Sequence, residues 1–212
     1  MEAFSTRRRR LVQDLKSVGI IRSSRVERAF LTVPREEFVP IELRQDAYLD
    51  CPLPLMGTGQ TISAPHMVAY MAEALDLVGC QKVLEVGAGS GYAAAILAEI
   101  LNPTSEEVEC PKVYSVEIDR ALVSFARANL DRTGYANRVE VVEGDGTLGL
   151  PRLAPFDRIL VSAAAPYVPP NLTEQLAEGG KMLVPIGTGL WGQQLYLIIK
   201  EKGKTSKHYI MD

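Results

Sequence analysis

The chain has 212 residues, of which 47% are hydrophobic and 23% charged, and its formal net charge is −3. This length and composition are typical of one globular domain with a single core. The small negative charge gives no reason to expect nucleic acid or a membrane as a partner, and no apolar run approaches the length of a membrane span. The three cysteines, Cys51, Cys80 and Cys110, lack metal-ligand spacing, which favours three reduced thiols in a cytoplasmic protein.

The first 80 residues are predicted to be helical and irregular. The cluster Arg7–Arg10 precedes apolar residues at helical spacing, which favours a solvated helix face over a binding patch. The sequence SRVE at residues 24–27 is a capping box that opens a short helix, and Pro34 ends that helix. Residues 34–62 are rich in proline and glycine and have little periodicity. A loop of this length inside a compact domain is usually functional.

A further helix is predicted to begin at Pro65, within the stretch GTGQTISAPHM at residues 57–67. Ser63 or Ala64 then occupies the cap position. For Ser63 two interpretations stay open, a helix cap or a hydroxyl that binds substrate. His66 has no cysteine or aspartate in metal or triad spacing, so a zinc site or a histidine-based triad is weakly supported.

From Lys82 onward, strands and helices alternate. Strands are predicted near residues 82–86, 112–117, 139–143, 158–162, 181–186 and 194–199, and helices near 91–101, 120–133 and 170–177. This alternation predicts an α/β fold, a doubly wound and mostly parallel Rossmann-like sheet with an N-terminal helical extension. Ligands of such sheets bind at the carboxyl ends of the strands. One crevice is therefore expected to collect the residues that follow the strands, 85–91, Glu117, Asp145 and 162–166.

The strongest signal in the chain is VLEVGAGSGY at residues 83–92. A buried strand leads through Gly87, Gly89 and Gly91 into an alanine-rich helix, which lets the backbone approach a nucleotide cofactor closely. The glycines follow Glu85 with the spacing G-x-G-x-G. A dinucleotide fingerprint has the spacing G-x-G-x-x-G, and its last glycine would fall on Tyr92. It resembles the cofactor loop of S-adenosylmethionine-dependent methyltransferases. The alternative is a plain strand-to-helix turn that needs positive φ.

Two further acids follow predicted strands. Glu117 ends the second strand, where an acid accepts hydrogen bonds from ribose hydroxyls. The alternative is an acid at a helix start, which fits Asp119 better. Asp145 lies between Gly144 and Gly146, so its carboxylate can face an adenine amino group while the glycines admit the ring. An ordinary Asp-Gly turn is the alternative there.

Several motifs, in one order, resemble the protein-L-isoaspartate O-methyltransferase family. They are TVPREEFVP, AYLD, GTGQTISAPHMVAYMAEAL, VLEVGAGSGYAAAILA, VEGDG and SAAAPYVPPNLTEQLAEGGKMLVPIG. The resemblance runs from about residue 20 to 200, and TISAPHM is highly specific to the family. It implies one methyltransferase domain, with a substrate-cleft region at 1–80, a cofactor-binding core at 81–200 and a short end at 201–212.

The resemblance also implies an activity and the residues that perform it. The activity is methyl transfer from S-adenosylmethionine to the free α-carboxylate of L-isoaspartyl residues in damaged proteins and peptides, which begins their repair. Ser63 is the implied active-site residue. The implied cofactor-binding residues are Glu85, Gly87, Gly89, Gly91, Glu117, Asp145 and Gly146. The implied substrate-binding residues are Thr61, Ser63, Ala64, His66, Ala164, Ala165 and Pro166. We expect a cytoplasmic monomer without a metal.

The chain departs from the family pattern in two places. The loop 102–111 is longer than in many relatives. Family members usually continue past residues 209–212 with a short strand that helps to close the cleft, so the end is expected to be short or truncated and the cleft to lack one wall. Two other functions stay open. One is an isoaspartyl-recognition module with little or no turnover, and the other is a methyltransferase of the same fold that acts on a small molecule or RNA.

Overall fold

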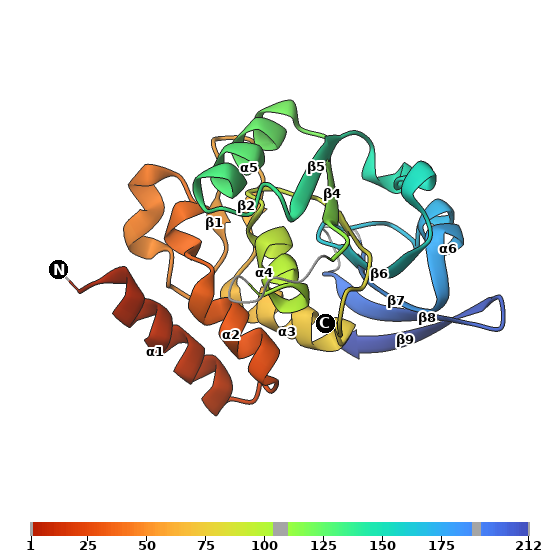
Figure 1. Cartoon of the computed structure of the whole chain (residues 1–212), viewed down its shortest axis with the longest axis horizontal. Helices are drawn as coiled ribbons and strands as arrows, with labels where there is room; N and C mark the ends of the chain where they lie inside the picture. The colour runs from red at the N-terminus through yellow and green to blue at the C-terminus, as the bar shows by residue number, and fades with distance from the viewer. Residues whose placement is uncertain (1, 104–109, 188–191, 212) are drawn as a thin grey trace.

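The structure is a computed structural model that describes residues 2–103, 110–187 and 192–211 (Figure 1). The α-helices are α1 (Phe4–Ser17), α2 (Ser24–Thr32), α3 (Pro65–Leu75), α4 (Tyr92–Leu101), α5 (Arg120–Arg132) and α6 (Pro170–Gln175). Four short 3-10 turns are η1 (Arg35–Glu37), η2 (Ile41–Asp46), η3 (Gly146–Leu148) and η4 (Pro151–Leu153). The strands are β1 (Leu53–Pro54), β2 (Thr61–Ile62), β3 (Val83–Val86), β4 (Val113–Glu117), β5 (Val139–Glu143), β6 (Phe156–Val161), β7 (Leu176–Ile186), β8 (Gln194–Glu201) and β9 (Lys204–Met211).

The main sheet has the strand order β5-β4-β3-β6-β7-β8-β9. The strands from β5 to β7 are parallel, and β8 and β9 continue the sheet in antiparallel pairing. This arrangement confirms the predicted α/β fold with a mostly parallel sheet. The strands β3, β4, β5 and β6 therefore have their carboxyl ends side by side at one end of the sheet. Ligands of such sheets bind at this end.

Alternate residues of each strand pack on opposite faces of the sheet. In β3, Val83 belongs to the core shared with α1 to α5, whereas Leu84 and Val86 belong to the core shared with α6. This follows from the twofold period of side chains along a strand. Figure 1 shows the N-terminal helices, in red and orange, grouped beside α3 and α4 and away from α6. The two faces are thus covered unequally.

The sequence favoured a solvated helix face for the cluster Arg7–Arg10. In the structure, this face is not uniformly solvated. Arg8, on α1, turns inward, and its Nη2 lies 2.9 Å from Glu36 Oε1. Its Nε donates to Tyr48 Oη at 2.7 Å, and Tyr48 Oη in turn donates to Glu36. Only 15% of the Arg8 side chain is exposed. The prediction is therefore wrong for Arg8, which fastens α1 to the irregular segment after Pro34.

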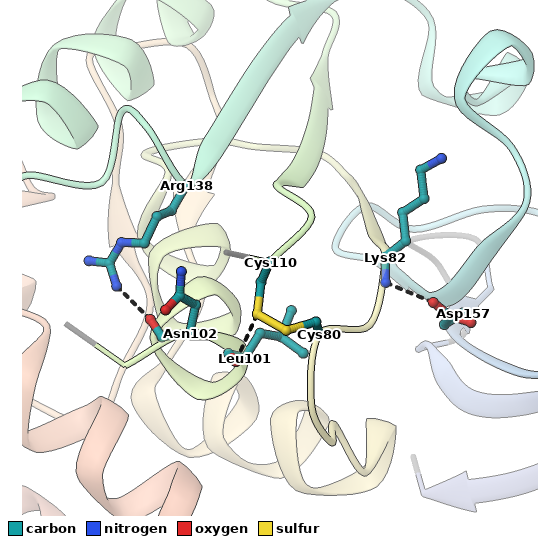
Figure 2. The surroundings of a disulfide bond; sticks show 7 residues. All are labelled: Cys80, Lys82, Leu101, Asn102, Cys110, Arg138 and Asp157. Carbon is teal, nitrogen blue, oxygen red and sulfur yellow. Dashed lines mark hydrogen bonds between the residues drawn. A yellow bond between two sulfur atoms is a disulfide. The ribbon is translucent and has the colours of Figure 1, made fainter. Parts of the chain in front are cut away.

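The prediction of three reduced thiols is also wrong. Cys80 and Cys110 form a disulfide, and Cys51 is the free cysteine (Figure 2). Cys80 precedes β3 and Cys110 precedes β4, so the bond joins the amino ends of two neighbouring parallel strands. The amino ends of the strands lie opposite their carboxyl ends, where ligands of such sheets bind. Most of the predicted long loop, residues 104–109, lies outside the described residues.

The C-terminal residues, for which a short or truncated end was expected, form the strand β9. β9 pairs with β8 from Glu201 opposite Lys204 to Leu195 opposite Met211. β7 also begins at Leu176, so the predicted helix at 170–177 ends two residues early as α6. In the described part of the chain no helix is long and apolar enough to cross a membrane.

Candidate active site

The glycine loop joins β3 to α4 in a conformation that suits glycine. Gly87, Gly89 and Gly91 have φ of +94°, +52° and +84°, a region that side chains with a Cβ rarely adopt. The amides of Gly87 and Ala88 both donate to the carbonyl of Val116, at 2.8 and 3.3 Å. A Cβ on Gly91 would approach Leu130 Cγ to 3.2 Å. Gly91 is therefore favoured by its positive φ and by its close packing against α5.

A cleft of about 250 Å³ opens at this loop, and we call it the glycine cleft. Six of the seven predicted cofactor residues line it, namely Glu85, Gly87, Gly89, Glu117, Asp145 and Gly146. The seventh, Gly91, lies behind it as the N-cap of α4. The structure thus brings the ends of β3, β4 and β5 together in one crevice, as the alternation of strands and helices predicted.

Glu117 is held at the end of β4 by two backbone amides. Its Oε2 accepts from Gly89 N at 2.9 Å and its Oε1 from Asp119 N at 3.0 Å. The helix α5 is capped by Asp119, whose Oδ1 accepts from Ala121 N at 2.8 Å. Asp119 is therefore the acid at the start of the helix, and this alternative does not apply to Glu117. Glu117, which is 8% exposed, presents a fixed carboxylate to the glycine cleft.

Glu85 is a fully buried carboxyl group in the wall of the same cleft. Ser115 Oγ donates to its Oε2, whereas its Oε1 has no hydrogen-bond partner among the described residues. Burial raises the pKa of Glu85 to about 8, and the charge of Glu117 acts in the same direction. A buried polar atom without a partner usually marks a place that a ligand or water completes.

Asp145 and Gly146 form the turn between β5 and η3. Asp145 Oδ1 accepts from Thr147 N at 2.9 Å and from Thr147 Oγ1 at 2.8 Å, and these bonds lower the pKa of Asp145. The turn interpretation is therefore correct in its geometry, yet Asp145 also lines the cleft. A Cβ on Gly146 would overlap Val86 Cγ1 in β3. Glycine is required there for the close approach of η3 to the sheet.

A second cleft, of about 380 Å³, adjoins the first, and we call it the serine cleft. Ser63, Ala64, His66 and Thr61 line it, as do residues of β7, β8 and β9 that the sequence did not single out, among them Pro185, Leu195 and Met211. Four residues line both clefts, namely Thr61, Ser63, Met71 and Ser162. The strand β9 therefore contributes Met211 to the wall of this cleft.

Ser63 does not cap the helix that follows it. The N-cap of α3 is Ala64, and the helix start is capped instead by Asp50, whose Oδ1 accepts from His66 N at 2.9 Å. The same oxygen lies 2.9 Å from His66 Nδ1, so His66 has the aspartate partner that sequence spacing did not reveal. The hydroxyl of Ser63 is thus not occupied by capping and sits where the two clefts meet.

The segment after β6 agrees only partly with the predicted substrate residues. Neither cleft is lined by Ala164, Ala165 or Pro166. Ala165 instead bridges to β7, donating its amide to Pro185 O at 3.0 Å. Ser162, which the sequence placed in the crevice without a specific role, lines both clefts, and its buried Oγ has no partner among the described residues. Its position directly after a buried strand was the available signal.

No group of three or more His, Cys, Asp or Glu side chains in the described ranges is placed to hold a metal ion. The site therefore consists of two adjoining clefts, one with glycines and carboxylates and one largely uncharged. They share the Ser63 segment, and this arrangement suits the juxtaposition of two ligands.

Comparison with known proteins agrees with this geometry. The family model for protein-L-isoaspartate(D-aspartate) O-methyltransferase matches residues 6–212. The curated protein-L-isoaspartate O-methyltransferase of Hyperthermus butylicus is 55% identical over 202 residues, covering 95% of this chain and 83% of that protein. That of Methanopyrus kandleri is 55% identical over 199 residues, covering 94% and 84%.

A solved structure is similar over the whole chain. It is described as a protein-L-isoaspartate O-methyltransferase of Plasmodium falciparum in complex with S-adenosyl-L-homocysteine. Its TM-score is 0.85 at 28% identity, and the match covers 100% of this chain and 96% of that chain. From the matched family model, the curated relatives and this structure together, the chain belongs to the protein-L-isoaspartate(D-aspartate) O-methyltransferase family.

Proposed function

We propose that this protein transfers a methyl group from S-adenosylmethionine to the free α-carboxylate of L-isoaspartyl residues in proteins and peptides, which begins their repair. The observation that carries the proposal is the meeting of the two clefts at Ser63 in a member of this family. A methyl donor in one cleft and an acceptor carboxylate in the other would face each other across that segment.

The glycine cleft fits the cofactor on two observations of its own. Glu85 Oε1 is buried and unpartnered among the described residues, and the amides of Gly89 and Asp119 hold the Glu117 carboxylate in the lining of the cleft. We assign Glu117 to the ribose hydroxyls and Asp145 to the adenine amino group. Gly87, Gly89 and Gly91 shape the loop so that the protein backbone can approach the cofactor closely. The bound cofactor supplies a methyl group activated by a sulfonium.

The serine cleft has the properties needed for an acceptor that is already ionised. A carboxyl group with an ordinary pKa near ~4 is a carboxylate at neutral pH, so no general base is needed. An oxygen of that carboxylate forms the new bond to the methyl carbon as the carbon–sulfur bond breaks and its electron pair returns to sulfur. Without the enzyme, the neighbouring backbone amide nitrogen then attacks the methyl ester and expels methanol, which leaves a succinimide. Water opens the succinimide, partly to normal aspartate.

The protein's part in this reaction is alignment and exclusion of water, which can supply several kcal/mol. We assign Ser63 Oγ to donating a hydrogen bond to the acceptor carboxylate. The N–H of Ala64, the N-cap of α3, adds affinity for the anion. Thr61, Ala64 and His66 line the cleft that would hold the peptide, and Ala164, Ala165 and Pro166 remain proposed contacts beyond its edge.

We extend the proposal to the surroundings of the protein. It acts as a cytoplasmic monomer, as a single methyltransferase domain over residues 1–212, and without a metal. The Cys80–Cys110 disulfide removes the support that three reduced thiols gave to this location, so the location rests on the family alone. The net charge of −3 gives little attraction for nucleic acid, which supports the absence of nucleic acid among its partners.

A paired assay tests the function. Labelled methyl transfer is measured on two peptides that differ only in one linkage, L-isoaspartyl in one and L-aspartyl in the other. In the normal residue the side-chain carboxylate lies one methylene further from the backbone, and a displacement near ~1 Å can cost about a hundredfold in rate. Methylation of the isoaspartyl peptide alone is expected. Equal rates on both peptides would reject the repair function. Methylation of neither, with tight cofactor binding, would indicate a recognition module without turnover.

A further inference from the structure

Arg35 is a fully buried arginine behind the Ser63 segment. It has no exposed surface, and it begins the turn η1. Its Nε donates to the carbonyl of Ala47 at 2.8 Å, and its Nη2 donates to the carbonyl of Ser63 at 2.9 Å. The guanidinium carbon lies 4.9 Å from the centre of the Tyr92 ring, at the start of α4. Arg35 therefore touches a segment that lines both clefts and a ring that lines the glycine cleft.

The charge of Arg35 lacks a matching carboxylate in the described part of the chain. None of the ion pairs there includes Arg35, and its Nη1 has no hydrogen-bond partner. Burial lowers the pKa of Arg35, but a guanidinium remains protonated in proteins. Burial also raises the pKa of Tyr92 to about 12, so the phenol beside it stays neutral. The charge of Asp50 favours the protonated form of Arg35, but the two side chains form no ion pair. A buried cation without a contacting anion is costly, which favours a further anion nearby.

The peptide group between Ser63 and Ala64 connects this cation to the serine cleft. Its carbonyl accepts from Arg35, and its N–H belongs to Ala64, the N-cap of α3. No acceptor for that N–H lies among the described residues, and Ala64 lines the serine cleft. Hydrogen bonds in a chain polarise one another, so donation by Arg35 to the carbonyl strengthens the Ala64 N–H as a donor. The helix dipole of α3 acts in the same direction.

We propose that Arg35 is a positioning residue for the methyl-accepting carboxylate, acting through the Ser63–Ala64 peptide. Its fixed positive charge makes the serine cleft prefer an anionic acceptor over a neutral group of the same shape. The inference rests on the proposed function, because it takes the acceptor to be a carboxylate held at Ser63. Arg35 itself does not contact the substrate.

The test compares two isoaspartyl peptides, one with the free α-carboxylate and one with a carboxamide in its place. Their affinities are measured by calorimetry with S-adenosylhomocysteine present, for the wild type, Arg35→Met, Arg35→Gln and Arg35→Lys. The wild type is expected to prefer the carboxylate. Both neutral variants should lose about tenfold of that preference, since a buried charge is screened weakly, and Arg35→Lys should retain most of it. Arg35→Gln can still donate to Ser63, which separates the charge from the hydrogen bond if Arg35→Met does not fold.

Arg158→Met is the matched control. Arg158 is 7% exposed and donates to the carbonyls of Leu75 and Asp76, in the amino-terminal half of β6 and away from both clefts. Its loss should lower stability without changing the carboxylate preference. A preference in folded Arg35→Gln equal to that of the wild type would overturn the inference, as would an equal loss in Arg158→Met. Failure of the wild type to methylate the carboxylate peptide would count against the proposed function instead.

Discussion

Glu85→Gln is expected to stabilise the ligand-free protein at neutral pH while weakening its cofactor binding. The carboxyl group of Glu85 is fully buried, with Ser115 donating to Oε2 and no described partner on Oε1. Glutamine has nearly the same shape, can still accept from Ser115 and carries no charge at any pH. The substitution therefore removes the charge and little else.

The size of the stabilisation follows from proton binding. The pKa of Glu85 rises from 4.5 to about 8 on folding, mainly because burial penalises the charged form. The folded protein thus binds more protons than the unfolded chain between these values, so the stability that protonated Glu85 provides below pH ~4.5 is lost as the pH rises towards ~8. At pH 7 the loss is on the order of 3 kcal/mol, from about 2.5 pH units at ~1.4 kcal/mol each.

Urea unfolding of the ligand-free wild type and variant at several pH values measures this directly. The wild type should lose stability between about pH 5 and pH 8, and Glu85→Gln should lose much less. Glu140→Gln, on the exposed part of β5, is the control and should follow the wild type. We assign the ammonium group of S-adenosylhomocysteine to the unpartnered Glu85 Oε1, where it favours the carboxylate. Calorimetry should therefore show the wild-type affinity for this ligand rising over the same range. Parallel stability curves for wild type and Glu85→Gln would refute the reasoning.

Three further predictions concern Ser63, Glu117 and the disulfide. Ser63→Ala should lower turnover far more than cofactor affinity. Thermal melting should show well under ~1 kcal/mol of lost stability, because Asp50 and not Ser63 caps α3. Near-normal turnover would contradict the role of Ser63 in binding the acceptor carboxylate. Glu117→Ala should weaken cofactor binding by about 1–3 kcal/mol in calorimetry, and an unchanged affinity would overturn its assignment to the ribose. Reducing the bond between Cys80 and Cys110, which are 30 residues apart, should lower the free energy of unfolding by about 3–4 kcal/mol and the melting temperature by roughly 10 °C. Cofactor affinity should persist, because the bond lies at the amino ends of the strands, and three titratable thiols in the unreduced protein would exclude this account.

The parts of the site that the sequence predicted are those encoded locally. The glycine loop at 87–91 follows the buried run at 83–86, and its positive φ values favour glycine, so both features are visible in one short stretch. Glu117 and Asp145 follow apolar strands directly. Because parallel strands align their carboxyl ends, local motifs sufficed to place these acids in one crevice.

The parts that were missed depend on contacts between distant residues. Asp50 caps a helix that begins 15 residues later, and Cys80 meets Cys110 only because β3 and β4 are neighbours. The strand β9 escaped prediction for a different reason. Residues 204–209 are exposed along this edge strand, so no alternation of apolar and polar residues marks it. An edge strand with no buried face leaves little trace in a hydrophobic pattern.

The lining shared by the two clefts has a consequence for inhibition. Thr61, Ser63, Met71 and Ser162 border both spaces, so no full layer of protein separates a ligand in one from a ligand in the other. A single compound that joins a nucleoside to an isoaspartyl mimic would span both, and binding of its second half would become intramolecular. Such linkage raises affinity by about 10²–10⁴ over either half without any new contact. A compound of this kind would gain its selectivity from the peptide half, because nucleoside-binding glycine loops are common to many enzymes while the TISAPHM segment that lines the serine cleft is specific to this family.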